Sequence, residues 1–187
     1  GPQALREAVA RHVMQGRNQY SPMTGLPALR QQVAVKIARS YGVQRDADSE
    51  ITITPGATEA IFCAVQALIH PGDEAIVLDP CYDSYEPSVE LAGGRCVHVP
   101  LASPDFAVDW QRLADAITPR TRLIFINSPH NPSGALLSRD DLDQLAALIR
   151  GRDIHLISDE VYEHLIFDGA RHASVLAHEE LYARAFV

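Results

Sequence analysis

Arg122-Leu-Ile-Phe-Ile-Asn-Ser-Pro-His-Asn-Pro-Ser-Gly134 joins an apolar run to two closely spaced prolines. Residues Leu123 to Asn127 form a short apolar, partly β-branched run, which is too short for a helix and typical of a fully buried strand. Pro129 and Pro132 then block regular structure and bias the residues before them toward extended backbone. We expect one or both of the bonds before these prolines to be cis. On residue types alone, this is either an ordinary strand-to-helix loop or a turn that holds a polar side chain beyond the strand.

Short apolar runs and helical stretches alternate over most of the chain. Because strands joined by helices of ten or more residues form right-handed crossovers, this pattern predicts an α/β fold with a mostly parallel sheet and helices on both faces. The expected strands are 51–54, 75–78, 96–99, 123–127, 154–158 and one that starts at 185. The expected helices are 3–15, 27–41, 57–70, 84–92, 109–117 and 138–149.

Three of the expected helices contain residues that mark a helix end, a cap or an apolar face. Helix 27–41 has a proline in its first turn, ends before Gly42, and is expected to turn one apolar face inward, made of Leu29, Val33, Ile37 and Tyr41. Asp109 is a candidate N-cap for the helix that follows it. Ser138 with Asp141 three residues later is typical of a capping box.

Composition sets the class of protein. A chain of 187 residues with 47% hydrophobic residues makes one large domain or a small pair, and it buries roughly 70% of the surface of the unfolded chain. No apolar run approaches the ~20 residues of a membrane span. The net charge of −8 disfavours a nucleic acid as partner. Cys63, Cys81 and Cys96 are an odd number without metal-ligand spacing, which favours reduced thiols and a cytoplasmic location. The first residues lack the basic end and apolar core of a signal peptide.

Polar residues follow the expected strands. They are Gly56-Ala57-Thr58, Asp79, Asn127 with Asn131, and Asp159. Because ligands of open parallel sheets bind beyond the carboxyl ends of the strands, we expect a ligand site there. A helix that opens at Ala57 offers free N–H groups and a positive dipole end to an anion, although such a turn also occurs in α/β proteins without any ligand. The glycines and lysine of a dinucleotide or P-loop site are missing.

Asp159 is the strongest single candidate at this edge. A carboxylate at the end of an apolar strand must be paired or hydrated, since burying it alone costs several kcal/mol; the alternative is that it caps the next segment. Tyr82 lies just beyond Asp79 and on its own is interpreted equally well as a packing residue, and Tyr85 is a weaker candidate. We expect Glu160 to point to the opposite side of the chain with a structural role. The eight histidines have no zinc-ligand grouping, and we interpret them as surface or structural residues.

Two ordered motifs carry a family resemblance. Asn127, Pro129, Asn131, Pro132 and Gly134 form an Asn-x-Pro-x-Asn-Pro-x-Gly pattern that resembles the signature loop of class I/II pyridoxal-phosphate aminotransferases of fold type I. Ile-Ser-Asp-Glu-Val-Tyr at 157–162 resembles the downstream motif of the same family. Segments 18–25 and 79–85 are similar to its methionine-preferring and kynurenine–oxoglutarate branches. The resemblance covers essentially the whole chain but about half of a typical member.

The resemblance implies a pyridoxal 5'-phosphate site. It assigns Ala57 and Thr58 to the phosphate, Asp159 to the ring nitrogen, Asn131 and Tyr162 to the ring oxygen, Tyr82 to the ring face, and Tyr20 to the phosphate in a neighbouring subunit. Residues 1–45 would be an N-terminal helical segment with an interface loop, and 46–187 a truncated cofactor-binding large domain without the small C-terminal domain. The lysine that binds the cofactor covalently is expected beyond Val187. The one lysine of the chain, Lys36, lies in no matching motif.

The implied activity is transamination between an L-amino acid of methionine or aromatic type and a 2-oxo acid. It belongs to the full-length homodimer, and we expect this chain alone to be inactive and to contain no catalytic residue or metal site. Two alternatives remain open: a pyridoxal-phosphate-dependent cysteine-conjugate β-lyase and a regulatory module that binds the cofactor. A nucleotide enzyme of Rossmann type is disfavoured by the loop at Gly56.

Overall fold

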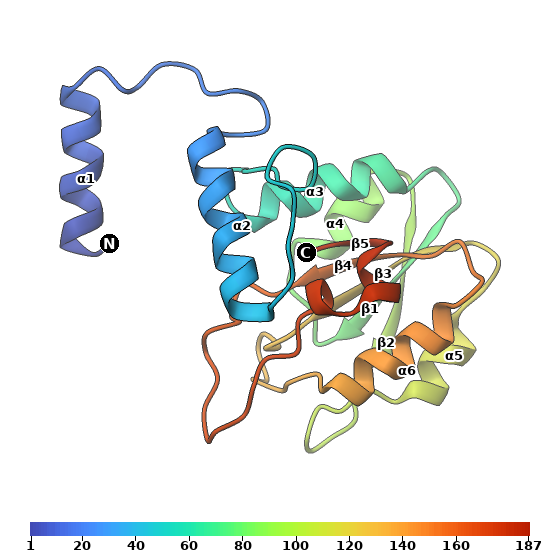
Figure 1. Ribbon diagram of the computed structural model, residues 1–187. Coiled ribbons are helices and arrows are strands. Elements are labelled where there is room, and N and C mark those ends of the chain that lie inside the picture. Colours follow the sequence, from blue (N-terminus) through green and yellow to red (C-terminus); the bar gives the residue numbers. More distant parts are fainter.

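The computed structural model describes all 187 residues. One parallel sheet holds five strands in the order β2-β1-β3-β4-β5, which confirms the predicted α/β fold. Helices cover both faces of this sheet (Figure 1). The strands are β1 Glu74–Asp79, β2 Arg95–Pro100, β3 Thr121–Asn127, β4 His155–Asp159 and β5 Ala185–Phe186. The helices are α1 Gln3–Met14, α2 Pro27–Tyr41, α3 Ala57–Leu68, α4 Tyr85–Leu91, α5 Trp110–Ala116, α6 Arg139–Ile149, the 3-10 turn η1 Val175–Ala177, and α7 Glu179–Tyr182.

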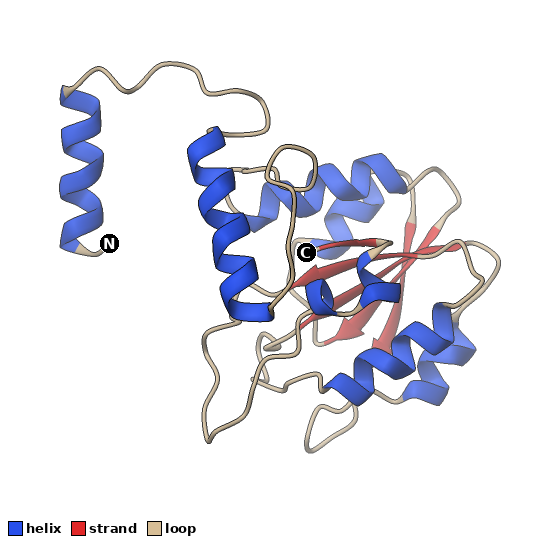
Figure 2. Ribbon diagram, in the orientation of Figure 1, coloured by secondary structure: helices blue, strands red, loops and turns tan.

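Strand β3 is the centre of the sheet, as its apolar run predicts. It pairs in parallel with β1 on one side and β4 on the other. Side chains that alternate along β3 enter two separate cores, because successive residues of a strand point to opposite faces. Leu123 and Phe125 pack with residues of α3 and α4, whereas Ile124 and Ile126 pack with residues of α5 and α6. The two layers of helices are seen above and below the strands in Figure 2.

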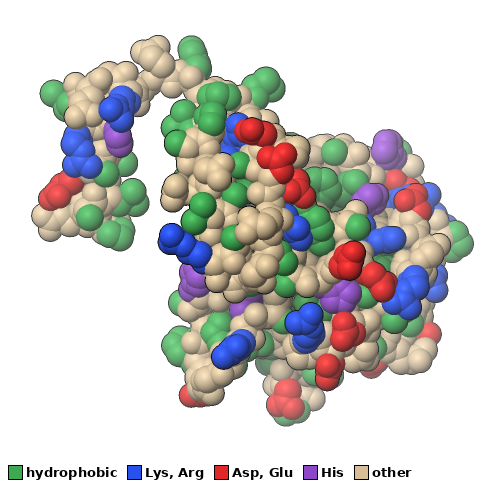
Figure 3. All heavy atoms as spheres, in the orientation of Figure 1, with side chains coloured by type: hydrophobic (Ala, Val, Ile, Leu, Met, Phe, Trp, Pro, Cys, Tyr) green, Lys and Arg blue, Asp and Glu red, His purple; other side chains and the backbone are tan.

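Helix α1 lies apart from the body of the molecule (Figure 1). None of its residues is buried, and its apolar side chains Leu5, Val9 and Val13 are more than half exposed. Hydrophobic side chains stand on its surface in Figure 3. The predicted helix is therefore present, but nothing within this chain covers it. None of the helices combines the length and the apolar character that crossing a bilayer requires.

Of the four residues predicted to share one face of α2, Val33, Ile37 and Tyr41 pack in the cluster around Ile51, and only Leu29 does not. The structure buries Arg30, Ala34 and Ile37, whereas Leu29 is 47% exposed. The Arg30 guanidinium donates hydrogen bonds to the carbonyl oxygens of Gly25 and Ala47, and it forms a 3.1 Å ion pair with Asp48. These partners satisfy a charge that burial would otherwise penalise. An apolar pattern does not reveal that an arginine in the first turn lies on the buried side of the helix.

Segment 51–54 is not a strand, contrary to the prediction. Ile51 packs against α2 instead of joining the sheet, and the Ile53 N–H donates to the carbonyl oxygen of Thr24 at 3.0 Å. Gly25, with φ of +92°, makes this close approach possible, because a Cβ there would lie 2.6 Å from Cβ of Ile53. Consequently Gly56 follows a loop that α2 holds in place, and no strand of the sheet precedes it.

The remaining boundaries agree with the sequence within a few residues. Helix α3 ends at Leu68, two residues earlier than predicted, because Ile69 is extended. Asp109 caps α5 by accepting a hydrogen bond from the N–H of Arg112, and Ser138 and Asp141 form the expected capping box of α6. The bonds before Pro129 and Pro132 are both cis, as expected.

Glu74, which is 1% exposed, gives the fold a measurable pH dependence. Hydrogen bonds from the Thr118 hydroxyl, then from Arg95 and Arg120, hold the pKa of Glu74 at about 2, below the ordinary 4.5. This stabilisation is complete above about pH 4.5 and is lost as the pH falls toward 2. Both arginines are more than half exposed, so that solvent screens their charge. We therefore expect the lowered pKa of Glu74 to contribute only ~1–2 kcal/mol to the free energy of unfolding.

Urea unfolding of wild type and Glu74→Gln at several pH values measures this contribution. Between about pH 5 and 2, the free energy of unfolding of the wild type should fall by ~1–2 kcal/mol more than that of the variant. Parallel pH profiles for the two proteins would contradict the assignment.

Candidate functional site

Asn127 fastens the loop after β3 to the end of β4. The two strand ends are in register, with Asn127 opposite Asp159. The Asn127 amide donates to the carbonyl oxygen of Asp159 at 2.8 Å, and its Oδ1 accepts the N–H of Asn131 at 2.7 Å. One side chain therefore fixes the backbone on both sides of the strand edge. Of the two interpretations of this loop, the rigid turn is the one that the structure bears out.

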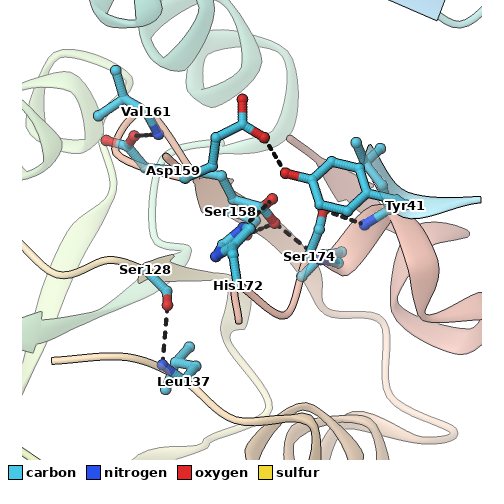
Figure 4. Close-up of polar contacts among 12 residues, drawn as sticks. Tyr41, Ser128, Leu137, Ser158, Asp159, Val161, His172 and Ser174 are labelled. Atoms are coloured by element: carbon cyan, nitrogen blue, oxygen red, sulfur yellow. Dashed lines mark hydrogen bonds and ion pairs between the residues drawn. The ribbon is translucent and has the colours of Figure 1, made fainter. Parts of the chain in front are cut away.

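The side chain of Asp159 is held at both of its oxygens. Oδ2 accepts a hydrogen bond from the Tyr85 hydroxyl at 2.8 Å. Oδ1 accepts the N–H of Val161 at 3.2 Å, and Figure 4 shows this second contact. Asp159 forms no ion pair within the chain and is only half-buried. A carboxylate has about four acceptor positions, so lone pairs remain for a further donor. The group is thus a fixed, ionisable acceptor at the edge of the sheet.

Strand alternation sets the side on which Asp159 points. Ile157 of β4 packs with Phe125 in the core under α3 and α4, and Leu156 packs in the opposite core. Asp159 is two residues beyond Ile157 and therefore extends the α3–α4 side of β4. Helix α3 contacts β4 on this side. The acid and the start of α3 accordingly belong to the same face of the sheet.

Tyr85 and Tyr82 form an aromatic group beside Asp159. Tyr85 is the first residue of α4 and is 2% exposed. Its ring stacks on Phe125 with centroids 4.6 Å apart, and Tyr82 meets it edge-on at 5.7 Å. Burial first, and then the nearby Asp159 carboxylate, raise the pKa of Tyr85 well above its ordinary value. The hydroxyl therefore stays protonated and acts as a donor. The sequence ranks Tyr85 below Tyr82, and only the contact with Asp159 reveals its importance.

The first turn of α3 has no side-chain cap. Gly56 is its N-cap with φ of +84°, and the Thr54 hydroxyl donates to the Gly56 carbonyl oxygen at 2.8 Å instead of capping the helix. Ala57 and Thr58 are exposed. The first N–H groups of a helix have no partner within it, and the dipole makes this end attractive to anions. The arrangement can bind a phosphate or carboxylate group.

The other predicted site residues, Asn131, Tyr162 and Tyr20, differ in how far they are exposed. Asn131 is half-buried in the loop after β3, and its side-chain amide makes no hydrogen bond within the chain. Tyr162 follows β4 in a turn and is 36% exposed. Tyr20 is fully exposed in the loop between α1 and α2, away from the sheet edge (Figure 1). Within one chain the structure does not bring Tyr20 to the site.

Glu160 points to the opposite side of the chain from Asp159, as predicted. Its carboxylate accepts hydrogen bonds from the Ser158 hydroxyl and the Val175 N–H, each at 2.9 Å, and it lies 2.8 Å from Nε2 of His172. In Figure 4, Ser158, His172 and Ser174 lie together toward Tyr41, away from Val161. The Glu160–His172 pair is nearly fully buried, and it anchors the backbone on the far side of the site.

Lys36 has its partner in the turn after β4 and does not contact Asp159. It forms an ion pair with Glu163, which also accepts a hydrogen bond from the Tyr41 hydroxyl. These contacts join α2 to the turn after β4. The amine of Lys36 is therefore a structural partner of Glu163, and the lysine of the family motif has no counterpart among the contacts of Asp159.

Comparison with known proteins adds the family context. Residues 2–187 match the family model for aminotransferases of class I and II. Methionine aminotransferase of Escherichia coli K12 is 52% identical over 185 residues, which are 99% of this chain and 48% of that protein. A probable N-succinyldiaminopimelate aminotransferase, DapC of Mycobacterium tuberculosis H37Rv, is 46% identical over 92% of this chain and 44% of its own length.

Solved structures agree with these matches. The structure of YbdL from Escherichia coli, described as having a methionine aminotransferase function, superposes with a TM-score of 0.96 at 52% identity, over 99% of this chain and 49% of that one. The structure of the aromatic aminotransferase from Pyrococcus horikoshii OT3 superposes with a TM-score of 0.93 at 36% identity, over 98% of this chain and 49% of that one. The chain spans about half the length of the curated relatives it matches.

Proposed function

This chain belongs to the family of class I and II aminotransferases, and from this premise we propose that the whole protein transfers an amino group between an L-amino acid and a 2-oxo acid, with pyridoxal 5'-phosphate as cofactor. The observation that carries the proposal is Asp159, a fixed carboxylate without a cationic partner, on the same face of the sheet as the uncapped start of α3.

The residues at this edge fit the two charged ends of the cofactor. The free N–H groups of Ala57 and Thr58 suit its phosphate, because a helix N-terminus favours anions. The Asp159 carboxylate suits a protonated ring nitrogen, since a charge-assisted hydrogen bond is about twice as strong as a neutral one. Between them, the ring of Tyr82 offers a flat apolar surface to one face of the pyridine.

When bound, the cofactor supplies a cationic ring that takes up electrons from the substrate carbon. The part of Asp159 is to keep the proton on the ring nitrogen. Asn131 and Tyr162 hold the ring oxygen through their side-chain amide and hydroxyl. We assign Tyr20 to the phosphate in a neighbouring subunit, which its complete exposure in one chain supports. A homodimer in the cytoplasm is therefore part of the proposal.

We further propose that this chain is the cofactor-binding part of a longer enzyme. Residues 1–45 would serve as a helical segment and subunit interface, and 46–187 as the large domain. The relatives are about twice as long as the aligned region, which supports this division. In the proposal, the lysine that binds the cofactor covalently lies outside this chain, so that the chain alone does not turn over.

The amino donor in this proposal is methionine or an aromatic amino acid. The 52% identity with a methionine aminotransferase and the 36% identity with an aromatic aminotransferase support this choice. Methionine and the aromatic amino acids have large side chains without an acidic group, in contrast to aspartate, for which other relatives are named.

A steady-state assay of the purified whole protein tests the proposal. With methionine and a 2-oxo acid, it should convert the 2-oxo acid to its amino acid in a reaction that depends on added pyridoxal phosphate. Pyruvate release from cystathionine without amino transfer would contradict transamination in favour of β-elimination. Cofactor binding without turnover of any amino acid would contradict an enzyme altogether.

A further inference from the structure

The hydroxyl of Tyr85 is the one side-chain donor that contacts the Asp159 carboxylate. It approaches Oδ2 at 2.8 Å, whereas Oδ1 is held by a backbone N–H, that of Val161. A carboxylate with one contact rotates freely about its last bond, but two donors on different oxygens fix its plane. Tyr85 therefore decides the direction in which the remaining lone pairs of Asp159 point.

Tyr85 itself has little freedom to move. Its ring stacks on Phe125 of β3 with an interplanar angle of 15°, and the ring of Tyr82 closes its edge at an angle of 74°. The residue is 2% exposed and begins α4 on the α3–α4 side of the sheet. Because two neighbouring rings clamp the phenol, the position of its oxygen is set by the core and not by the loop.

The hydrogen bond also has a defined direction. Burial raises the pKa of the Tyr85 phenol well above its ordinary value, and the Asp159 carboxylate raises it further. The phenol thus remains neutral and donates, while the carboxylate remains the acceptor. A neutral donor orients the carboxylate without neutralising it, in contrast to an arginine or lysine, which would compete with a cationic ligand for the same charge.

We propose that Tyr85 is a positioning residue: its hydroxyl fixes the Asp159 carboxylate in the orientation that meets the ring nitrogen of the cofactor. This inference rests on the proposed function. It also links Tyr82 to Asp159, since both contact Tyr85 and both are assigned to the same ring.

Tyr85→Phe is the clean variant, because it keeps the stacked ring and removes only the oxygen. The measurement is the dissociation constant of the whole protein for pyridoxal phosphate, determined by absorbance titration. A second ligand is the analogue with carbon in place of the ring nitrogen, which cannot bond to Asp159. Tyr182→Phe is the matched control, since it removes another phenol that donates to a carboxylate, that of Glu50, which is not among the contacts of Asp159.

We expect Tyr85→Phe to weaken pyridoxal phosphate binding about tenfold, the size of one hydrogen bond to a charged group. Binding of the carbon analogue should stay within about twofold of wild type for the same variant. Tyr182→Phe should leave both ligands unaffected. The difference between the two ligands is a readout that a merely structural role of Tyr85 would not produce.

Two results would overturn the inference. Equal weakening of both ligands would mean that Tyr85 supports only the packing of the site, and unchanged binding of pyridoxal phosphate would mean that its hydroxyl is dispensable. An Asp159→Asn variant distinguishes a failure of the positioning role of Tyr85 from a failure of the proposed function. If Asp159→Asn weakens pyridoxal phosphate binding selectively while Tyr85→Phe does not, the positioning role alone fails. If Asp159→Asn is also without effect, the recognition of the ring nitrogen fails and the inference falls with it.

Discussion

Asp159→Ala is expected to slow transamination by the whole protein at least about 100-fold, or ~3 kcal/mol of transition-state free energy. The substitution removes the acceptor that we assign to the protonated ring nitrogen, and with it the charge that keeps this proton in place. The Tyr85 hydroxyl and the Val161 N–H then lose their acceptor too. Steady-state rates with methionine as the amino donor measure the effect.

A matched control is Asp153→Ala, which removes an exposed carboxylate just before the other end of β4. Its rate should equal that of wild type. Circular dichroism and urea unfolding of both variants establish that the fold is intact. A rate for Asp159→Ala within about threefold of wild type would remove Asp159 from the proposed role, since such a change is less than ~1 kcal/mol.

Phe125→Ala is expected to cost about 3–5 kcal/mol of the free energy of unfolding. Phe125 lies in the central strand, is 1% exposed, and packs with residues from β1, α3 and α4. Truncation leaves a cavity in that core and also removes the ring on which Tyr85 stacks at 4.6 Å. We therefore expect weaker cofactor binding as well as lower stability. Urea unfolding monitored by circular dichroism measures the first effect.

Phe62→Ala is the control, because Phe62 on α3 is 40% exposed and an exposed truncation should change stability by less than ~1 kcal/mol. Similar midpoints for the two variants, with unchanged m values, would mean that the core under α3 and α4 does not hold the fold together in the way described here.

The sequence predicts the sheet and the helix ends well because their signals are local. The apolar run at β3, the Asp109 cap and the Ser138–Asp141 capping box are each readable from adjacent residues. The departures at Arg30 and at 51–54 have a tertiary cause. Arg30 is buried because the carbonyl oxygens of Gly25 and of Ala47, the latter 17 residues away, accept its hydrogen bonds. Ile53 lies against Gly25 and not in the sheet.

The candidate site likewise contains residues that the sequence identifies and residues that only tertiary contacts identify. Asn127 and Asp159 stand at strand ends, so the sequence places them at the correct edge before any contact is known. Tyr85 is different, because its role in the site depends on the stacking with Phe125 and on the hydrogen bond to Asp159, which is 74 residues away. The pairing of Glu160 with His172 is equally invisible in the sequence, since an irregular turn brings the two together.

The proposed function depends on the contact between the Asp159 carboxylate and the ring nitrogen of pyridoxal phosphate. A crystal structure of the whole protein with the cofactor bound would show this contact. We expect an oxygen of Asp159 at about 2.7–2.9 Å from the ring nitrogen, the range of a charge-assisted hydrogen bond, with the phosphate at the N–H groups of Ala57 and Thr58. A ring nitrogen bonded to solvent or to another side chain, with the phosphate away from α3, would contradict it.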